Sequence, residues 1–260
     1  MAISFFIKRK QPKEFKKGEG EVKKPLAKPQ AQPQSKPEPV IREEKAPAGK
    51  QCYAFMDASN LFWGGGKSLG FDVDFVKLKR FLEDKFGVTK IFYYAGVRIF
   101  DFPYSYSDSL PLNLTELLAH LQKLETEPNP PEPDKLKNTI SKIRFYLMLE
   151  QTGYELKIKP AKVHFDEYDE NREKPILKAN CDVDMTFDMM RYLEQYQSIV
   201  AMTGDGDFVS VLNYLKQKGR SLVVISRFDS TANEIKDIAG KNLFDLANFR
   251  RQIQKMWQSS

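Results

Sequence analysis

The sequence predicts an α/β fold with an open, mainly parallel β-sheet, on the strength of two observations. Short apolar runs recur along the chain, and uninterrupted runs of this length are typical of strands buried on both faces of a parallel sheet. Segments whose apolar residues follow helical spacing separate these runs, which gives the strand–helix alternation of an α/β fold. The main runs are Cys52–Met56, Ile91–Ala95, Ile199–Met202 and Leu222–Ile225.

Positive charge is concentrated at the beginning of the chain. Residues 1–50 contain 13 Lys or Arg and 6 Asp or Glu, whereas the other residues contain 28 and 29. Residues 11–50 also hold 7 of the 15 prolines, so we expect 1–50 to be a disordered basic tail. Such a tail is either a solvated tether or a weak, sequence-independent attractor of nucleic acid. We expect residues 51–260 to form the folded domain.

The composition excludes several classes of protein. Cys52 and Cys181 are the only cysteines and the two histidines are far apart, which argues against a disulfide framework, a zinc–thiolate site and a catalytic triad. No run approaches 18 apolar residues, so we expect no membrane span and, by default, a cytoplasmic protein. A homo-oligomer remains open, because the sequence does not fix the oligomeric state.

Helical spacing places the remaining elements between and after the strands. A helix over Asp74–Phe86 ends at Gly87, which is typical of a helix C-cap. Two further helices at about 113–151 form a predicted insertion that covers one face of the sheet. These two helices are expected at Asn113–Leu124 and Asp134–Gln151. The other expected elements are helices at Asn233–Ala239 and Leu246–Trp257, a strand at Gly153–Ile158, and a hairpin within Pro160–Leu177.

The loop over Gly96–Pro111 carries Arg98, Tyr104 and Tyr106. Aromatic and arginine side chains of this kind can stack on nucleotides and pair with them. They can equally be ordinary surface residues, so the sequence leaves both interpretations open.

Two carboxylates lie in the turn that directly follows the expected strand at Ile199–Met202. The chain turns through Thr203-Gly204-Asp205-Gly206-Asp207 and then enters a helix with Phe208, Val211, Leu212 and Leu215 on one face. This turn therefore lies at the carboxyl edge of the sheet, where ligands bind in open α/β folds. One acid can be explained as a helix cap. Two acids among glycines favour a cation site.

A second acidic stretch begins at Lys178 and opens a helix that we expect to reach about Gln195. Asp182 lies at the helix start, where the helix dipole favours a carboxylate. Asp184 and Asp188 are four residues apart on one face and repel each other unless a positive group lies between them. The spacing does not decide which of these three acids faces a ligand.

Several of these acids are predicted to meet at one edge of the sheet. Asp57, Asp205 and Asp207 each follow a buried strand, and Asp182 opens the helix that precedes one of these strands. Clustered carboxylates need positive compensation, and a divalent Mg²⁺ or Mn²⁺ ion is the natural form of it. Metal sites of this kind usually act on phosphates by polarising them and activating water, without a protein nucleophile.

Three motifs follow one another along the chain. They are Phe55-Met56-Asp57-Ala58-Ser59-Asn60, Lys178-x-x-x-Asp182-Val183 with Asp188, and Thr203-Gly204-Asp205-Gly206-Asp207-Phe208. Together they resemble the NYN domain, and more closely its LabA-like branch within the PIN-like nuclease superfamily. The resemblance covers about residues 51–245 and implies a Rossmann-like, three-layer α/β/α fold and metal-dependent cleavage of RNA.

The resemblance also implies roles for individual residues. Asp57, Asp182, Asp205 and Asp207 would be the catalytic, metal-binding acids, and Asp188, which falls on a further acid position of the family, would also bind the metal. Asn60 would orient the first acid or a substrate phosphate. The side chains that we expect to contact RNA are Ser59, Asn60, Lys178, Thr203 and Arg227.

Two other functions compete with a ribonuclease. Asp182-Val183-Asp184-Met185-Thr186 spells the DxDxT motif of haloacid-dehalogenase-like phosphatases. That motif needs an apolar strand directly before its first aspartate, and the mixed, charged segment before Asp182 does not provide one. A catalytically silent RNA-binding or adaptor domain of the same fold is the second alternative, which the complete set of acids disfavours without excluding it.

Overall fold

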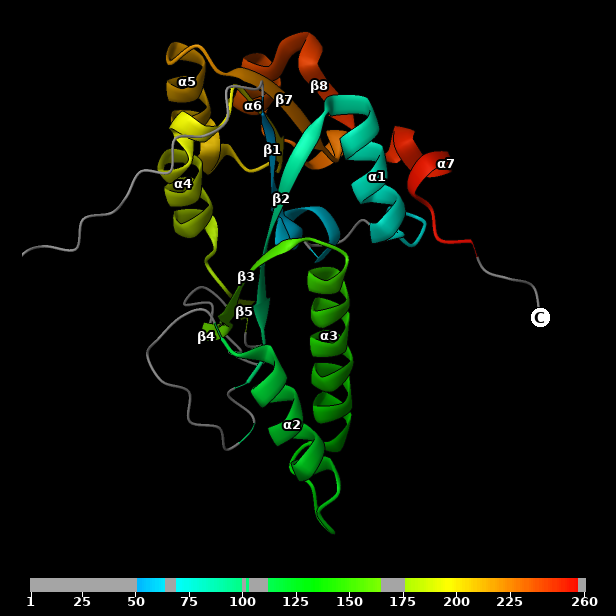
Figure 1. Ribbon diagram of the computed structural model, residues 1–260. Coiled ribbons are helices and arrows are strands. Elements are labelled where there is room, and N and C mark those ends of the chain that lie inside the picture. Colours follow the sequence, from blue (N-terminus) through cyan, green and yellow to red (C-terminus); the bar gives the residue numbers. More distant parts are fainter. Residues whose placement is uncertain (1–50, 64–68, 100–101, 103–111, 165–175, 257–260) are drawn as a thin grey trace, which may run out of the picture. The chain divides into compact units, whose positions relative to one another are not determined.

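A six-stranded sheet, in which every neighbouring pair of strands is parallel, forms the centre of the fold (Figure 1). The computed structural model describes residues 51–63, 69–99, 102, 112–164 and 176–256. The strand order is β3-β2-β1-β6-β7-β8, and the predicted open parallel α/β sheet is thereby confirmed. The strands are β1 Cys52–Asp57, β2 Val88–Val97, β3 Glu155–Pro160, β6 Ser198–Met202, β7 Ser221–Ser226 and β8 Leu243–Asp245.

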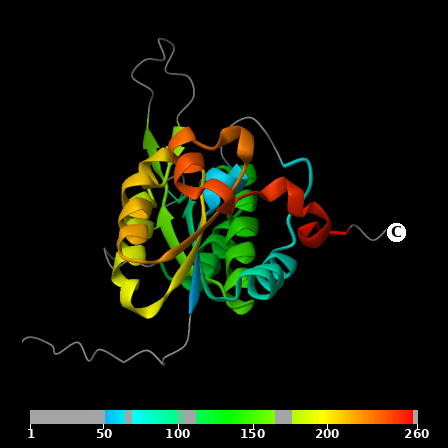
Figure 2. The same cartoon turned by 90° about the horizontal axis from the view of Figure 1, so that it is seen from above.

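Helices cover both faces of this sheet, so the fold has the three predicted α/β/α layers (Figure 2). The first face carries α1 Phe75–Phe86, α2 Leu114–Glu125, α3 Pro133–Gln151 and the short α7 Arg250–Ile253. The second face carries α4 Asp182–Arg191, α5 Val209–Gln217 and α6 Asn233–Ala239.

The central strands divide their side chains between two cores. In β1, Ala54 and Met56 pack among the helices of the first face, while Tyr53 and Phe55 pack on the second. All four are buried because successive side chains of a strand point to opposite faces. A strand covered on both sides needs apolar residues at every position, which is why an uninterrupted apolar run predicts it.

Helix ends follow the chemistry of their boundary residues. The Asp74 side chain accepts hydrogen bonds from the backbone N–H groups of Val76 and Lys77, which caps the first turn of α1. Gly87 ends α1 with φ of 66°, a left-handed conformation that glycine adopts without a steric cost. Helices α2 and α3 lie where the sequence predicts a helical insertion between β2 and β3.

The structure differs from the sequence prediction at several boundaries. The acidic stretch after Lys178 is not helical from its start, because Lys178 ends β5 and α4 begins at Asp182. The predicted helix over Leu246–Trp257 is instead a 3₁₀ turn, Leu246–Phe249, followed by the single turn of α7. The three-residue β8 was not predicted.

The hairpin expected within Pro160–Leu177 is present as two short antiparallel strands, β4 Lys162–His164 and β5 Ile176–Lys178. Its predicted turn around Asp169–Asn171 lies outside the described residues. Tyr104 and Tyr106 of the predicted nucleotide-contacting loop also lie outside them, and Arg98 directly follows β2.

Candidate functional site

The site lies where the strand order reverses. Strand β1 connects onward to β2 on one side, whereas its other neighbour, β6, connects onward to β7 in the opposite direction. The carboxyl ends of β1 and β6 at such a reversal are the usual ligand position in open α/β sheets. Asp57 is the last residue of β1, and Thr203 directly follows β6.

Hydrogen bonds join the ends of these two strands through Asp57. The backbone N–H of Asn60 donates to Asp57 Oδ1 at 3.1 Å, and the Thr203 hydroxyl donates to Asp57 Oδ2 at 3.4 Å. Asn60 in turn accepts from the backbone N–H of Gly204 at 2.9 Å through its Oδ1. The π-helical turn after β1, Ser59–Trp63, is thus tied to the loop after β6.

Asp57 is buried, with only 6% of its surface exposed. Burial raises the pKa of its carboxyl from the ordinary value of 3.8 to about 6, and the nearby Asp182 and Asp205 carboxylates act in the same direction. The hydrogen bonds from Asn60 and Thr203 oppose that rise. A carboxylate at this position is therefore poorly solvated and gains from a positive partner.

Three further carboxylates meet beside Asp57. One oxygen each from Asp182, Asp205 and Asp207 lies within 4.8 Å of the others, and we call these three residues the acid group. Asp205 also accepts a hydrogen bond from the backbone N–H of Asp207 and caps the 3₁₀ turn Gly206–Phe208. The capping interpretation is therefore correct for Asp205, but it accounts for neither of the other two carboxylates.

The first turn of α4 brings Asp182 to the acid group. The segment before α4 packs tightly on the end of β2, where a Cβ atom added to Gly96 would lie 2.4 Å from the Cβ of Ala179. The Tyr146 hydroxyl holds the same point by donating to the Gly96 carbonyl at 2.9 Å. Only glycine leaves enough space there for α4 to begin so close to the sheet.

The other two acids of α4 have lysine partners on β3. Asp184 forms an ion pair with Lys159. Asp188 is buried, lies 3.5 Å from the Lys157 ammonium, and accepts a 2.9 Å hydrogen bond from the Tyr94 hydroxyl. In the structure Asp182 joins the acid group, whereas Asp184 and Asp188 face lysines. Asp188, which the sequence predicts among the metal ligands, thus lies outside the acid group.

The loop after β7 supports the turn that carries Asp205. The Gly204 carbonyl accepts from the Ala232 N–H at 2.9 Å, and a Cβ on Gly204 would lie 3.1 Å from the Thr231 Cα. Arg227 begins this loop, and its carbonyl accepts from the Thr231 hydroxyl at 2.7 Å. The loop is therefore fastened to the site, with the Arg227 side chain half-buried.

Two other predicted site residues, Ser59 and Lys178, have no described side-chain contact with the acid group. Ser59 is exposed and begins the π-helical turn next to Asn60. Lys178 ends β5, and its side chain lies outside the described part of the structure. The phosphatase-like motif, Asp182–Thr186, lies within the first turns of α4 and not at the end of a sheet strand. The phosphatase interpretation therefore does not fit the fold.

Sequence reasoning missed the lysines and the tyrosine that balance α4. The sequence did contain a signal for the lysines. Lys157 and Lys159 are two residues apart and so lie on one face of β3, and Asp184 and Asp188 share one face of α4. The tyrosine is less visible, since Tyr94 occurs within a continuous apolar strand. Its partner Asp188 becomes apparent only from the packing of α4 on β2.

A family model describing the NYN domain matches residues 52–246, which is most of the chain and includes every member of the acid group. The chain belongs to the NYN domain family. NYN domains form part of the PIN-like nuclease superfamily, so this chain has a nuclease-type fold and is expected to bind nucleic acid. The predicted resemblance is confirmed.

One curated relative of this NYN domain is the low amplitude and bright protein LabA of Synechococcus elongatus, which is 33% identical over 103 residues. The match covers 40% of this chain and 54% of LabA, so the chain spans about half the length of that relative. A solved structure of a Vibrio parahaemolyticus protein of unknown function, VPA0982, is 15% identical. It has a TM-score of 0.47, covering 79% of this chain and 96% of that one.

In the part of the NYN domain that the structure describes, none of the helices has both the length and the apolar character needed to cross a bilayer.

Proposed function

We propose that this NYN domain is a metal-dependent ribonuclease that hydrolyses phosphodiester bonds of RNA in the cytoplasm. The observation that supports this most directly is the acid group at the reversal of strand order, with the buried carboxyl of Asp57 beside it. A site built from carboxylates on this edge of a nuclease-type fold is suited to an ion that neutralises phosphate.

The donor atoms fit a hard divalent cation. Asp57, Asp182, Asp205 and Asp207 offer carboxylate oxygens, which Mg²⁺ and Mn²⁺ prefer. Cys181, next to Asp182, does not compete as a soft ligand, because burial raises the pKa of its thiol to about 12 and keeps it protonated at neutral pH. These four aspartates are the residues that we assign to the metal.

The neighbouring residues hold these acids in place. Asn60 fixes the turn after β1 against Gly204, and the Thr203 hydroxyl links Asp57 to the backbone N–H of Asp205, from which it accepts at 3.2 Å. A bound divalent ion supplies polarisation of the scissile phosphate and a lowered pKa for the attacking water. The protein then needs no nucleophile of its own.

Substrate contacts are assigned to polar residues of the segments around the acid group. Asn60 and Thr203 touch the backbone of the site directly, and Ser59 is exposed one residue before Asn60. Arg227 and Lys178 are the cations that we assign to RNA phosphates. The loop that begins at Arg227 is hydrogen-bonded to Gly204, which keeps this arginine near the site.

The test compares RNA cleavage by the wild type with cleavage by Asp205→Asn, in Mg²⁺, in Mn²⁺ and in chelator. The amide keeps the shape and the capping oxygen of Asp205 but removes its charge, so we expect cleavage to fall at least about a hundredfold. Asp84→Asn, on the exposed surface of α1, is the matched control and should cleave like the wild type. Metal-dependent cleavage that survives in Asp205→Asn would refute the site. Binding of RNA without cleavage by the wild type would instead identify a silent RNA-binding domain.

A further inference from the structure

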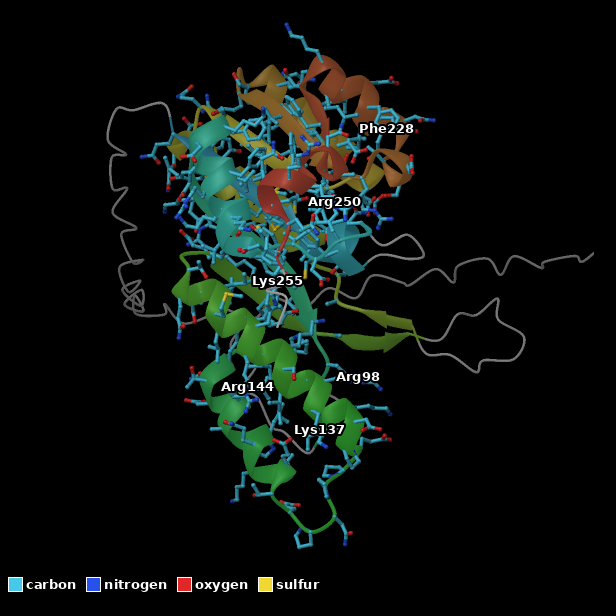
Figure 3. All side chains as sticks on the ribbon, turned by 90° about the vertical axis from the view of Figure 1, so that its right-hand side faces the viewer. Arg98, Lys137, Arg144, Phe228, Arg250 and Lys255 are labelled. Atoms are coloured by element: carbon cyan, nitrogen blue, oxygen red, sulfur yellow. The ribbon has the colours of Figure 1, made fainter. Side chains whose placement is uncertain are left out.

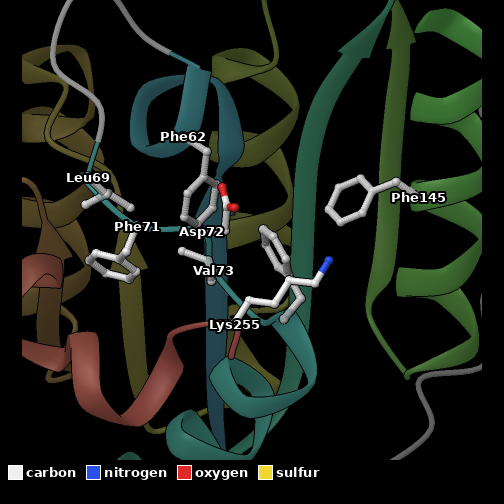
Figure 4. Close-up of a pocket in the computed structure, with 8 residues that line it drawn as sticks. Phe62, Leu69, Phe71, Asp72, Val73, Phe145 and Lys255 are labelled. Carbon is white, nitrogen blue, oxygen red and sulfur yellow. The ribbon is translucent and has the colours of Figure 1, made fainter. Parts of the chain in front are cut away.

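An aromatic pocket of about 410 Å³ lies against the core on the first face of the sheet and shares no residue with the acid group (Figure 4). This volume is within the range of small-molecule binding sites. Its lining is apolar at the centre and charged at the margin. The residues on which the following inference depends are Phe62, Phe71, Phe75, Phe145, Asp72 and Lys255.

The pocket is joined to the acid group through one turn of the chain. Asn60 and Phe62 belong to the same π-helical turn, Ser59–Trp63. Asn60 binds the loop that carries Asp205, whereas Phe62 lines the pocket. Two peptide units separate their Cα atoms by at most about 7.6 Å. A single-stranded substrate whose phosphate lies at the acid group can therefore follow this turn to the pocket.

The aromatic rings form a continuous apolar surface. Phe62 and Phe145 each meet Phe75 edge to face, with ring centroids 5.2 and 5.1 Å apart. Phe71 comes from the segment before α1, and the Arg250 guanidinium lies over its ring at 5.5 Å. All four phenylalanines are only half-buried, so each retains ring surface for a flat ligand.

Backbone pairing holds the charged margin in a fixed position. The Lys255 N–H donates to the Asp72 carbonyl at 2.8 Å, and the Asp74 N–H donates to the Ile253 carbonyl at 2.7 Å. Val73 and Gln254 form an antiparallel bridge between these two segments. An acidic and a basic residue thereby both border the pocket, and in Figure 4 the Lys255 side chain extends toward Phe145.

We propose that this pocket binds one nucleobase of a single-stranded RNA whose phosphate backbone passes the acid group. The proposal rests on the proposed function only for the choice of RNA as substrate. Aromatic rings stack on the faces of bases, and this stacking provides much of the affinity of single-strand binding sites. The edge of a base offers both donors and acceptors, which match the Asp72 carboxylate and the Lys255 ammonium.

Positive side chains extend from the pocket along the same face, which suits the phosphates of a bound strand. Arg250 and Lys255 lie at its α7 end, and Arg144 directly precedes the pocket residue Phe145 on α3. Lys137 lies seven residues before Arg144 and therefore on the same side of α3. All four side chains are exposed, and Figure 3 shows them one below another in the order Arg250, Lys255, Arg144 and Lys137.

The experiment measures equilibrium binding of a fluorescent single-stranded RNA octamer to the full chain in chelator, where metal-dependent cleavage does not occur. A second octamer lacks its bases but keeps every phosphate. We expect the wild type to bind the complete octamer about 5- to 100-fold more tightly than the abasic one. Phe71→Ala should lose most of this ratio, and Phe71→Trp should restore it. Tyr214→Ala, an exposed aromatic on α5, is the control and should keep the wild-type ratio.

Equal binding of the two octamers to the wild type would overturn the proposal and would favour an apolar protein segment as the occupant. An unchanged ratio in Phe71→Ala would overturn it as well. Because binding is measured without metal, the two proposals fail separately. A protein that never cleaves RNA can still show the base-dependent ratio, and an active nuclease can lack it.

Discussion

Aspartates at the tip of α4 and on its side that faces the sheet have opposite electrostatic surroundings. Asp184 and Asp188, on the sheet side, have Lys159 and Lys157 as partners. Asp182, at the tip, lies instead among the carboxylates of Asp205 and Asp207. An acid that the protein itself neutralises contributes to structure, whereas acids gathered together favour a cation from outside. The position of each acid relative to β3 decides which role it has.

The largest expected effect separates Asp182 from Asp184, which are two residues apart in the same helix. Asp182→Asn should lower metal-dependent RNA cleavage at least about a hundredfold, since it removes one charge from the acid group. Asp184→Asn should stay within a few-fold of the wild type, because its partner is Lys159 and not the proposed metal. Rates at saturating RNA and Mn²⁺ provide the measurement. Equal losses in the two variants would show that the tip and the side of α4 do not differ in function.

A smaller effect concerns the free energy that a cation adds to the fold. An ion that binds only the folded acid group at a hundredfold excess over its Kd stabilises the protein by about 2.7 kcal/mol. For a domain of this size each kcal/mol raises the melting temperature by roughly 2–4 °C. Thermal melts in chelator and in millimolar Mn²⁺ should therefore differ by several degrees.

In the same melting experiment, Asp57→Asn tests whether this carboxylate binds the metal. The pKa of Asp57 is raised to about 6, so at neutral pH its charged form destabilises the metal-free fold relative to the unfolded chain. The neutral amide should leave the metal-free melting temperature equal to or above that of the wild type, and should abolish most of the rise with Mn²⁺. The assignment of Asp57 to the metal fails if this variant responds to Mn²⁺ as the wild type does.

A loss of stability without a loss of metal response is expected on the sheet side of α4. Asp188→Ala removes the acceptor of the buried Tyr94 hydroxyl and the partner of Lys157, which should cost about 1–3 kcal/mol of unfolding free energy. The melting temperature in chelator should fall accordingly, while the rise on adding Mn²⁺ should persist. A variant that melts normally but loses the Mn²⁺ response would place Asp188 with the acid group after all.

Convergence of the acids could be predicted because it depends on strand direction alone. In a parallel sheet, every residue that follows a strand reaches the same edge, so Asp57 and Asp205 were expected to be neighbours before any contact was known. The part of the site that depends on packing could not be predicted in this way. The pairing of Asp188 with Tyr94 requires the distance between α4 and β2, which no local pattern contains.

Tertiary contacts also explain the missed boundaries near the end of the chain. Helical spacing over Leu246–Trp257 predicted one long helix, but residues after Ile253 pair with the segment before α1 and leave the helical path. Three-residue β8 is too short to show a strand pattern and exists because β7 offers it hydrogen-bonding partners. The aromatic pocket was not foreseen for the same reason, since Phe62, Phe145 and Lys255 meet only in the folded chain.

The close packing of Gly96 against Ala179 means that the four aspartates alone do not ensure a correctly formed site. Gly96 carries no chemistry and lies on a different element from each of the four proposed metal-binding aspartates. Yet a single methyl group there would push against Ala179, three residues before Asp182, and displace the helix tip that delivers this acid. A variant with another residue at this position would keep all four aspartates and still misplace Asp182 for the proposed ion. The proposed activity then depends on a residue that has no functional group.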